Sequence, residues 1–142
     1  MPTKNNDKPR IIHHRNEWGW GKSITCITDN GYGTATLGIT KEHEYDEEQD
    51  KLVVVDQAVI SNVSVHHTHR CMGYGDMLLK ECEDEALKAG FDTVYLWATP
   101  NSVAFEWYER RGYVQCPELC IIPTGDEDLT SEATVKMKKQ LK

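Results

Sequence analysis

The feature that most constrains the fold is one stretch, residues 63–90, in which an apolar strand ends in a glycine-spaced turn that opens into an amphipathic helix. It reads VSVHHTHRCMGYGDMLLKECEDEALKAG. Apolar residues recur at helical spacing from Asp76 to Ala89, and Gly90 stands where a glycine commonly ends a helix. We therefore predict a strand, a tight turn and a helix over residues 76–89, with something held at the start of that helix.

Other segments of the chain carry strand and turn signals. KSITCIT and TATLGIT flank an Asn-Gly turn signal and predict a hairpin. The run LVVVDQAVISNVSV predicts a strand buried on both faces, with Asp56 and Gln57 interrupting it as a turn or bulge. TVYLWAT predicts another strand, VAFEWYERR a short helix that begins after Pro100–Ser102 and ends at Gly112, and YVQCPELCIIP and ATVKMKKQL two last strands.

The order of these segments predicts the fold class. Strands and helices alternate in the second half, so we expect an α/β fold whose sheet is partly parallel, and the early hairpin makes the sheet mixed. A chain of 142 residues fits one domain, residues 1–142, in which the polar residues 1–10 are expected to be disordered.

Composition excludes several classes of protein. A net charge of −7 argues against nucleic-acid binding, which needs clustered Lys and Arg. No apolar run is long enough to span a membrane, and the polar N-terminus resembles no secretory signal, so we expect a soluble, cytoplasmic protein. The odd number and wide spacing of the cysteines predict free thiols at Cys26, Cys71, Cys82, Cys116 and Cys120.

The turn before the helix has the chemistry of an anion site. Gly73 and Gly75 leave the backbone accessible, the first amides of a helix favour an anion such as phosphate, and Arg70 adds a positive charge. A tight connection without a ligand is the alternative reading of the two glycines. The turn lacks the G-K-[ST] of a P-loop and the third glycine of a dinucleotide fold.

Two motifs resemble those of the GNAT superfamily of acetyl-CoA-dependent N-acetyltransferases. The pyrophosphate loop of that family reads [QR]-x-x-G-x-[GA], and here the six places are filled by Arg70, Cys71, Met72, Gly73, Tyr74 and Gly75. The second signature looks like the family's Asn followed by Tyr, Gly and an aromatic residue, here Asn101, Tyr108, Gly112 and Tyr113. The ending VKMKKQL also looks like the family's last strand, so the resemblance covers residues 53–141.

The resemblance implies a fold, a cofactor and a reaction. It implies a GNAT-like mixed sheet, partly splayed and flanked by helices, which binds acetyl-CoA as co-substrate without a metal. The pantetheine arm would contact the backbone of Val63 and Val65 and the side chain of Asn101, and the loop would hold the pyrophosphate. Tyr108 would protonate the departing thiolate during direct acetyl transfer to a primary amine; without the motif, it reads as a helix residue packed near Trp107.

The chain departs from the family pattern where a general base would stand. Ala58, Val59 and Ile60 occupy the strand positions that carry a Glu or His in some members, and Leu96 replaces the Glu of others. Asp56 is the nearest carboxylate, but it also reads as a turn residue. We therefore expect either a water relay or an acceptor whose amine loses its proton easily.

A second departure is the short N-terminal region, which leaves no room for the family's two helices beside the acceptor site. A homodimer could complete that site, or the acceptor could be a large protein or peptide amine rather than a small molecule. Without the base and the acceptor wall, the alternative function is a non-catalytic acyl-CoA-binding or partner-docking module of the same fold.

Two charged clusters stay open in the sequence. The acidic run KEHEYDEEQDK, residues 41–51, predicts a solvated turn, although it could attract a cationic acceptor. His66, His67 and His69 predict a solvated turn with one imidazole near the phosphates; a metal site is the other reading.

Overall fold

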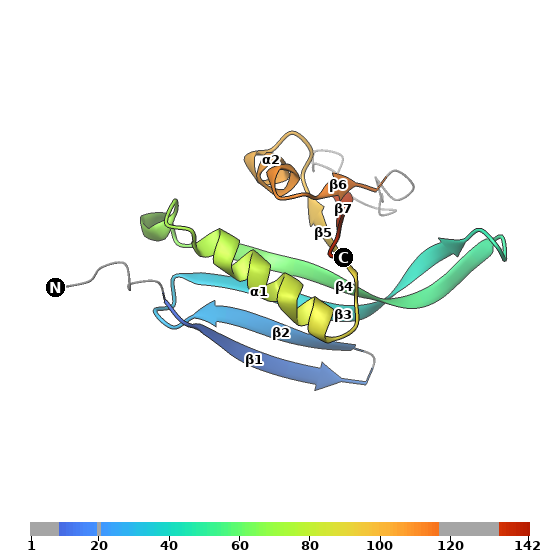
Figure 1. The fold of residues 1–142 in the computed structure, drawn as a ribbon, viewed down its shortest axis with the longest axis horizontal. Helices are drawn as coiled ribbons and strands as arrows, with labels where there is room; N and C mark the ends of the chain where they lie inside the picture. Colours follow the sequence, from blue (N-terminus) through green and yellow to red (C-terminus); the bar gives the residue numbers. More distant parts are fainter. Residues whose placement is uncertain (1–8, 20, 117–133) are drawn as a thin grey trace, which may run out of the picture.

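The structure is a computed structural model that describes residues 9–19, 21–116 and 134–142. Among these residues one sheet of seven strands has the order β1-β2-β3-β4-β5-β7-β6 (Figure 1). The strands are β1 (Ile11–Trp18), β2 (Gly21–Thr28), β3 (Gly33–Asp46), β4 (Lys51–Val65), β5 (Thr93–Ala98), β6 (Val114–Gln115) and β7 (Val135–Gln140).

The sheet is mixed because one of its junctions is parallel. Helix α1 (Tyr74–Lys88) connects β4 to β5 as a crossover, and these two strands pair in parallel. The other neighbours pair antiparallel. The predicted α/β class and mixed sheet are confirmed.

The β4–β5 junction is short. Only Ala58 with Val94 and Val59 with Tyr95 are paired. Beyond them β5 stays paired with β7, whereas β4 follows β3 to Val65. The two strands thus part after Val59, as the splayed sheet of the resemblance requires.

Strand β4 has a bulge at Asn62 and Val63, a few residues after its last pair with β5 at Val59. The register with β3 shifts between Thr34 and Thr36, so two residues of β4, Asn62 and Val63, lie opposite one residue of β3. Asn62 has a φ of 56°, a left-handed conformation that asparagine tolerates. The interruption predicted at Asp56 and Gln57 is therefore wrong, because both residues pair regularly with β3.

Both α-helices of the described residues contribute to one apolar core, whereas the 3-10 helix η2 (His67–His69) has no buried residue. Helix α1 lies across β2, β3 and β4, and α2 (Val103–Arg110) lies near β6 and β7 (Figure 1). Ser102 begins α2 as its N-cap, since its Oγ accepts a hydrogen bond from the backbone N–H of Phe105 at 3.0 Å. Side chains from helix and sheet meet in the core, among them Leu37, Ile60, Leu78, Leu96 and Met137.

The hairpin of β3 and β4 is longer than predicted. β3 continues to Asp46 and β4 begins at Lys51, so most of the acidic run is strand and only residues 47–50 make the turn. We call the outer part of this hairpin, residues 41–56, the β3–β4 arm. The arm extends past the end of α1 (Figure 1), and its Leu52 and Val54 are exposed. The expectation that this strand is buried on both faces is wrong, because α1 does not reach the arm.

Other differences concern the ends of elements. Strand β1 was not predicted, because its sequence IIHHRNEW is polar and largely exposed as an edge strand. α1 begins two residues earlier than expected, after Gly73. Residues 1–8, which we expected to be disordered, and Cys120 lie outside the described residues. Within the described part, no helix is long and apolar enough to cross a membrane.

Candidate active site

The glycine loop presents its backbone at the start of α1. Cys71 and Gly73 adopt positive φ values of 67° and 85°. Gly73 is the N-cap of α1 and supplies no side-chain acceptor to the first amides. These amides and the positive end of the helix dipole are therefore available to an anion. Gly73 and its exposed neighbour Met72 leave the loop surface open.

The two glycines of the loop meet different requirements. A Cβ on Gly73 would have open space around it, so its positive φ is what favours glycine. A Cβ on Gly75 would lie 3.0 Å from Cζ2 of Trp107. Gly75 thus permits the close approach of α2 to the first turn of α1.

An ion pair strengthens this helix contact. Arg111 is hydrogen-bonded through Nε and Nη2 to the two carboxylate oxygens of Asp76, the latter at 3.1 Å, and its Nη1 donates to the Trp107 carbonyl at 3.0 Å. Its guanidinium also lies 4.0 Å from the centroid of the Trp107 ring. The hydrogen bond from Arg111 holds the pKa of Asp76 below its ordinary value.

Tyr108 lies on α2 beside Trp107. Its half-buried ring makes edge-to-face contacts with Trp107 at 5.2 Å and with Tyr113 at 5.8 Å. Burial, with a smaller contribution from Cys82, raises the pKa of Tyr108 above its ordinary value. No buried side-chain oxygen of the described residues lacks a hydrogen-bond partner. The Tyr108 hydroxyl makes no hydrogen bond to the described residues, and its raised pKa keeps it protonated at neutral pH.

A buried polar network lies behind Tyr108. The Tyr113 hydroxyl donates to Glu83 at 2.9 Å, and Lys139 Nζ lies 3.2 Å from both Glu83 carboxylate oxygens. Burial, followed by the charge of Glu83, raises the pKa of Tyr113. Sequence reasoning missed this network, although an acid at position 83 on the apolar face of a helix is a signal that it needs a partner.

The remaining predicted contacts lie along the two parting strands. Val63 and Val65 are on β4 beyond its last pair with β5. Arg70 folds back so that its Nε donates to the Val65 carbonyl at 3.1 Å. Asn101 follows β5, is exposed, has a φ of 63° and makes no side-chain hydrogen bond to the described residues. The structure thus puts Val63 and Val65 on one side of the parting and Asn101 on the other.

The histidine triplet is packed against aromatic rings. His69 stacks on Tyr32 with ring centroids 3.8 Å apart, and His66 stacks on His67 at 4.4 Å. Tyr74 continues this group and accepts a hydrogen bond from Asn30 Nδ2 at 2.8 Å. The triplet therefore belongs to a group of packed rings directly before the loop.

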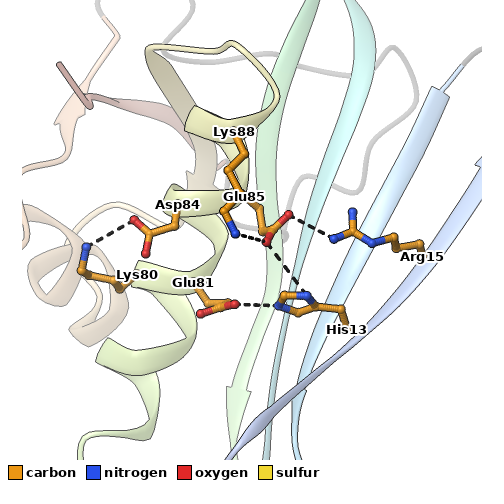
Figure 2. Close-up of polar contacts among 7 residues, drawn as sticks. All are labelled: His13, Arg15, Lys80, Glu81, Asp84, Glu85 and Lys88. Carbon is orange, nitrogen blue, oxygen red and sulfur yellow. Dashed lines mark hydrogen bonds and ion pairs between the residues drawn. The ribbon is translucent and has the colours of Figure 1, made fainter.

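A different cluster has the residue types of a metal site. His13 of β1 and Glu81 and Glu85 of α1 bring three ligand atoms within 4.8 Å of one another. Figure 2 shows that the two imidazole nitrogens face different carboxylates, Glu81 at 2.6 Å and Glu85 at 4.0 Å. Arg15 and Lys88 each approach Glu85 to 3.3 Å. These partners make the cluster an ion-pair network that joins β1 to α1.

The positions expected for a general base stay apolar. Ala58, Ile60 and Leu96 are buried in the core. The Asp56 carboxylate is exposed and lies 3.0 Å from Lys41 Nζ, so it stabilises the hairpin. Among the described residues, the four cysteines are free thiols.

Comparisons with known proteins agree with this geometry. The sequence profile of the acetyltransferase (GNAT) family matches residues 6–113. A search of curated proteins returned no match. The fold is similar to that of the ribosomal-protein-S18-alanine N-acetyltransferase from Escherichia coli, with a TM-score of 0.56 and 19% identity, covering 88% of this chain and 72% of that one.

Two more solved structures share the fold. A nourseothricin acetyltransferase matches with a TM-score of 0.59 and 18% identity, covering 86% of this chain and 66% of that one. A chain of the NatC complex bound to Gag peptide and CoA matches with a TM-score of 0.56 and 16% identity, covering 84% and 71%. At such identities the likeness concerns the fold.

Proposed function

Because the chain belongs to the acetyltransferase (GNAT) family, we propose that it moves an acetyl group from acetyl-CoA to a primary amine. One observation carries the proposal. β4 and β5 part after two residue pairs, and β4 then leads into a loop whose amides have no side-chain cap. This arrangement suits a long ligand with a diphosphate at one end.

Binding of acetyl-CoA would use both the loop and the parted strands. The backbone amides from Cys71 to Gly75 would bind the pyrophosphate, and the charge of Arg70 would stand beside it. The backbone of Val63 and Val65, on the part of β4 that does not pair with β5, would bond the pantetheine arm, and the Val65 carbonyl already accepts a hydrogen bond from Arg70 Nε. Asn101, on the other side of the parting, would contact the same arm.

The chemistry is a direct transfer. The amine nitrogen attacks the thioester carbonyl carbon, the C–S bond breaks, and the sulfur takes a proton from the Tyr108 hydroxyl. Burial raises the pKa of Tyr108, so the hydroxyl is protonated when the thiolate leaves. Most of the rate acceleration comes from holding both reactants together, for which effective molarities of about 10⁵ M or more are known.

The acceptor amine must be neutral when it attacks. At pH 7, deprotonation costs about 4.6 kcal/mol for an amine with a pKa of about 10.4. For an amine with a pKa near 7.7 it costs about 1 kcal/mol. Because apolar residues occupy the positions of a general base, water takes the proton that the acceptor ammonium loses before it attacks. The rate should therefore rise with pH, and a flat profile between about pH 6 and 9 would contradict this part of the proposal.

Calorimetry with CoA and a thiol-release assay test the proposal. We expect CoA to bind, and acetyl-CoA to release thiol in the presence of some members of a panel of amines, peptides and polyamines. Proteins of similar fold include one that is named for a ribosomal protein and one bound to a peptide, so peptide termini belong in the panel. Absence of CoA binding would overturn the proposal.

The apolar base positions favour a second candidate, a non-catalytic acyl-CoA-binding module. CoA binding without thiol release from any acceptor would select it. Light scattering after size exclusion tests whether a homodimer completes the acceptor side, and a monomer with full turnover would exclude that arrangement.

A further inference from the structure

A cavity of about 490 Å³ lies where the β3–β4 arm meets the other half of the sheet. Glu44, Tyr45 and Glu47 line it from the arm, Gln57 from β4, Tyr95 from β5 and Lys138 from β7. This volume lies in the range of pockets that take small molecules. None of these residues belongs to the loop or to α2.

The cavity begins where β4 and β5 are still paired. Gln57 directly precedes the first pair, Ala58 with Val94, and Tyr95 is part of the second, with Val59. The loop lies at the opposite end of β4, beyond Val65. A donor held by its diphosphate at the loop and extended back along β4 presents its acyl end toward this junction, so the cavity lies on the acceptor side.

A buried network holds the polar wall of the cavity. The Lys136 side chain is only 2% exposed and its Nζ donates to Gln57 Oε1 at 2.8 Å. The Gln57 amide thereby turns its Nε2 toward the Glu44 carboxylate, 3.4 Å away. Lys136 Nζ also lies 4.7 Å from the centroid of the Tyr95 ring. Since Gln57 and Lys136 are buried, this wall is formed before any ligand arrives.

The lining has the chemistry of a site for an organic cation. Among the residues that line the cavity, two carboxylates, Glu44 and Glu47, outnumber one ammonium, Lys138. The second ammonium, that of Lys136, is buried behind Gln57 and does not line the cavity. The rings of Tyr45 and Tyr95 add faces on which a cation or an aromatic body can rest. Part of the acidic run, predicted from its composition to be a solvated turn, thus lines a cavity.

We propose that this cavity binds the acceptor, a small primary amine that arrives as an ammonium ion attached to an apolar or aromatic body, and that Glu44 and Glu47 select it. The inference rests on the proposed acetyl transfer. It assigns the substrate class to the lining that the β3–β4 arm gives to this cavity.

The test compares Glu44→Gln and Glu47→Gln with Glu48→Gln. The control removes the same charge from the same β3–β4 hairpin, and Glu48 does not line the cavity. With phenethylamine as acceptor, we expect KM to rise about tenfold or more in each pocket variant, as for loss of one charged contact. We expect kcat and the Kd of CoA to change less than twofold. Equal KM values in all three variants would overturn the inference.

A second measurement is independent of turnover. Phenethylamine is titrated into the ¹⁵N-labelled wild-type chain without CoA, and shifts are expected at the amides of Gln57 and Tyr95 and not at those of the loop. The Glu44→Gln variant should abolish them, whereas Glu48→Gln should keep them. Absence of these shifts in the wild type would contradict the pocket while CoA calorimetry still reports on the acetyltransferase proposal.

Discussion

The two ends of α1 are built in opposite ways. At its start a glycine cap leaves the first amides without side-chain acceptors, and α2 approaches through Gly75 and Trp107. From its middle to its other end, Glu81 and Glu85 are held by His13 and Arg15 of β1 and by Lys88 (Figure 2). Carboxylates at one end are satisfied by side chains of the protein, whereas the first amides at the other end have no side-chain acceptor at the N-cap.

This contrast separates function from anchoring within one helix. Side chains at the end that faces β1 attach the helix to an edge strand, where ion pairs are partly exposed and weakly stabilising. The starting end carries the loop to which we assign the pyrophosphate. Substitutions in the glycine loop should therefore change activity, and those at the far end only stability.

The largest effect is expected at Tyr108. Tyr108→Phe keeps the ring packing and removes the proton donor, so kcat should fall about 100-fold or more while the Kd of CoA stays the same. Steady-state kinetics and calorimetry measure the two. Tyr32→Phe, which keeps its stack with His69, serves as the control, and an equal loss in both variants would contradict the assigned role.

The next effect concerns Gly75. In Gly75→Ala the new Cβ lies about 3.0 Å from the Trp107 ring, so we expect a loss of about 1–3 kcal/mol of unfolding free energy and weaker CoA binding. Trp107→Leu in the same chain should restore part of the stability. Gly73→Ala should lose about 1–2 kcal/mol of unfolding free energy, because alanine disfavours the positive φ at this position. Trp107→Leu should not restore this loss. An equal recovery of stability in both glycine variants would contradict the distinction between them.

A smaller effect is expected at Asp76, whose side chain is 57% exposed. Asp76→Asn should cost about 0.2–1 kcal/mol, the range of surface ion pairs. Because Arg111 lowers the folded pKa of Asp76 below its ordinary 3.8, the contribution is present above that value and is lost as the pH falls through the folded pKa. Denaturation of the wild type and of Asp76→Asn between about pH 6 and 2 should therefore show their unfolding free energies converging as the pH falls. A difference that stays constant over this range would contradict the prediction.

The smallest effect is expected at the far end of α1. Glu81→Gln weakens the contact with His13 and should lower stability by about 0.2–1 kcal/mol, less in high salt. Neither the Kd of CoA nor kcat should change. Asp84→Asn, which removes a single pair with Lys80 on the same helix, is the matched comparison, and a change in kcat in either variant would remove the functional contrast between the ends.

The sequence predicts local features of the fold well and distant pairings poorly. The turn, α1 and the β2–β3 hairpin follow from neighbouring residues, and so does the cap of α2 at Ser102. β1 and the arm depend on which strand lies beside them, and their composition reads as polar turn. The bulge was expected at Asp56 and lies at Asn62, because register is fixed by β3.

The same limit applies to the site. The loop and Tyr108 were identified by motif, and their roles remain predictions that the experiments above test. Glu83 with Lys139 and His13 with Glu81 join residues 56 and 68 positions apart, so no local pattern shows these partners. The proposed acceptor cavity likewise needs four strands, β3, β4, β5 and β7, to be brought together.

The short β4–β5 junction has a mechanical consequence. Two residue pairs are all that join backbone to backbone between the described β1–β4 and β5–β7–β6 portions of the sheet. An extended molecule lying between the parted strands would act as a further strand that ties the two portions together. Rigidity of this protein would then depend on its substrate as much as on its own chain.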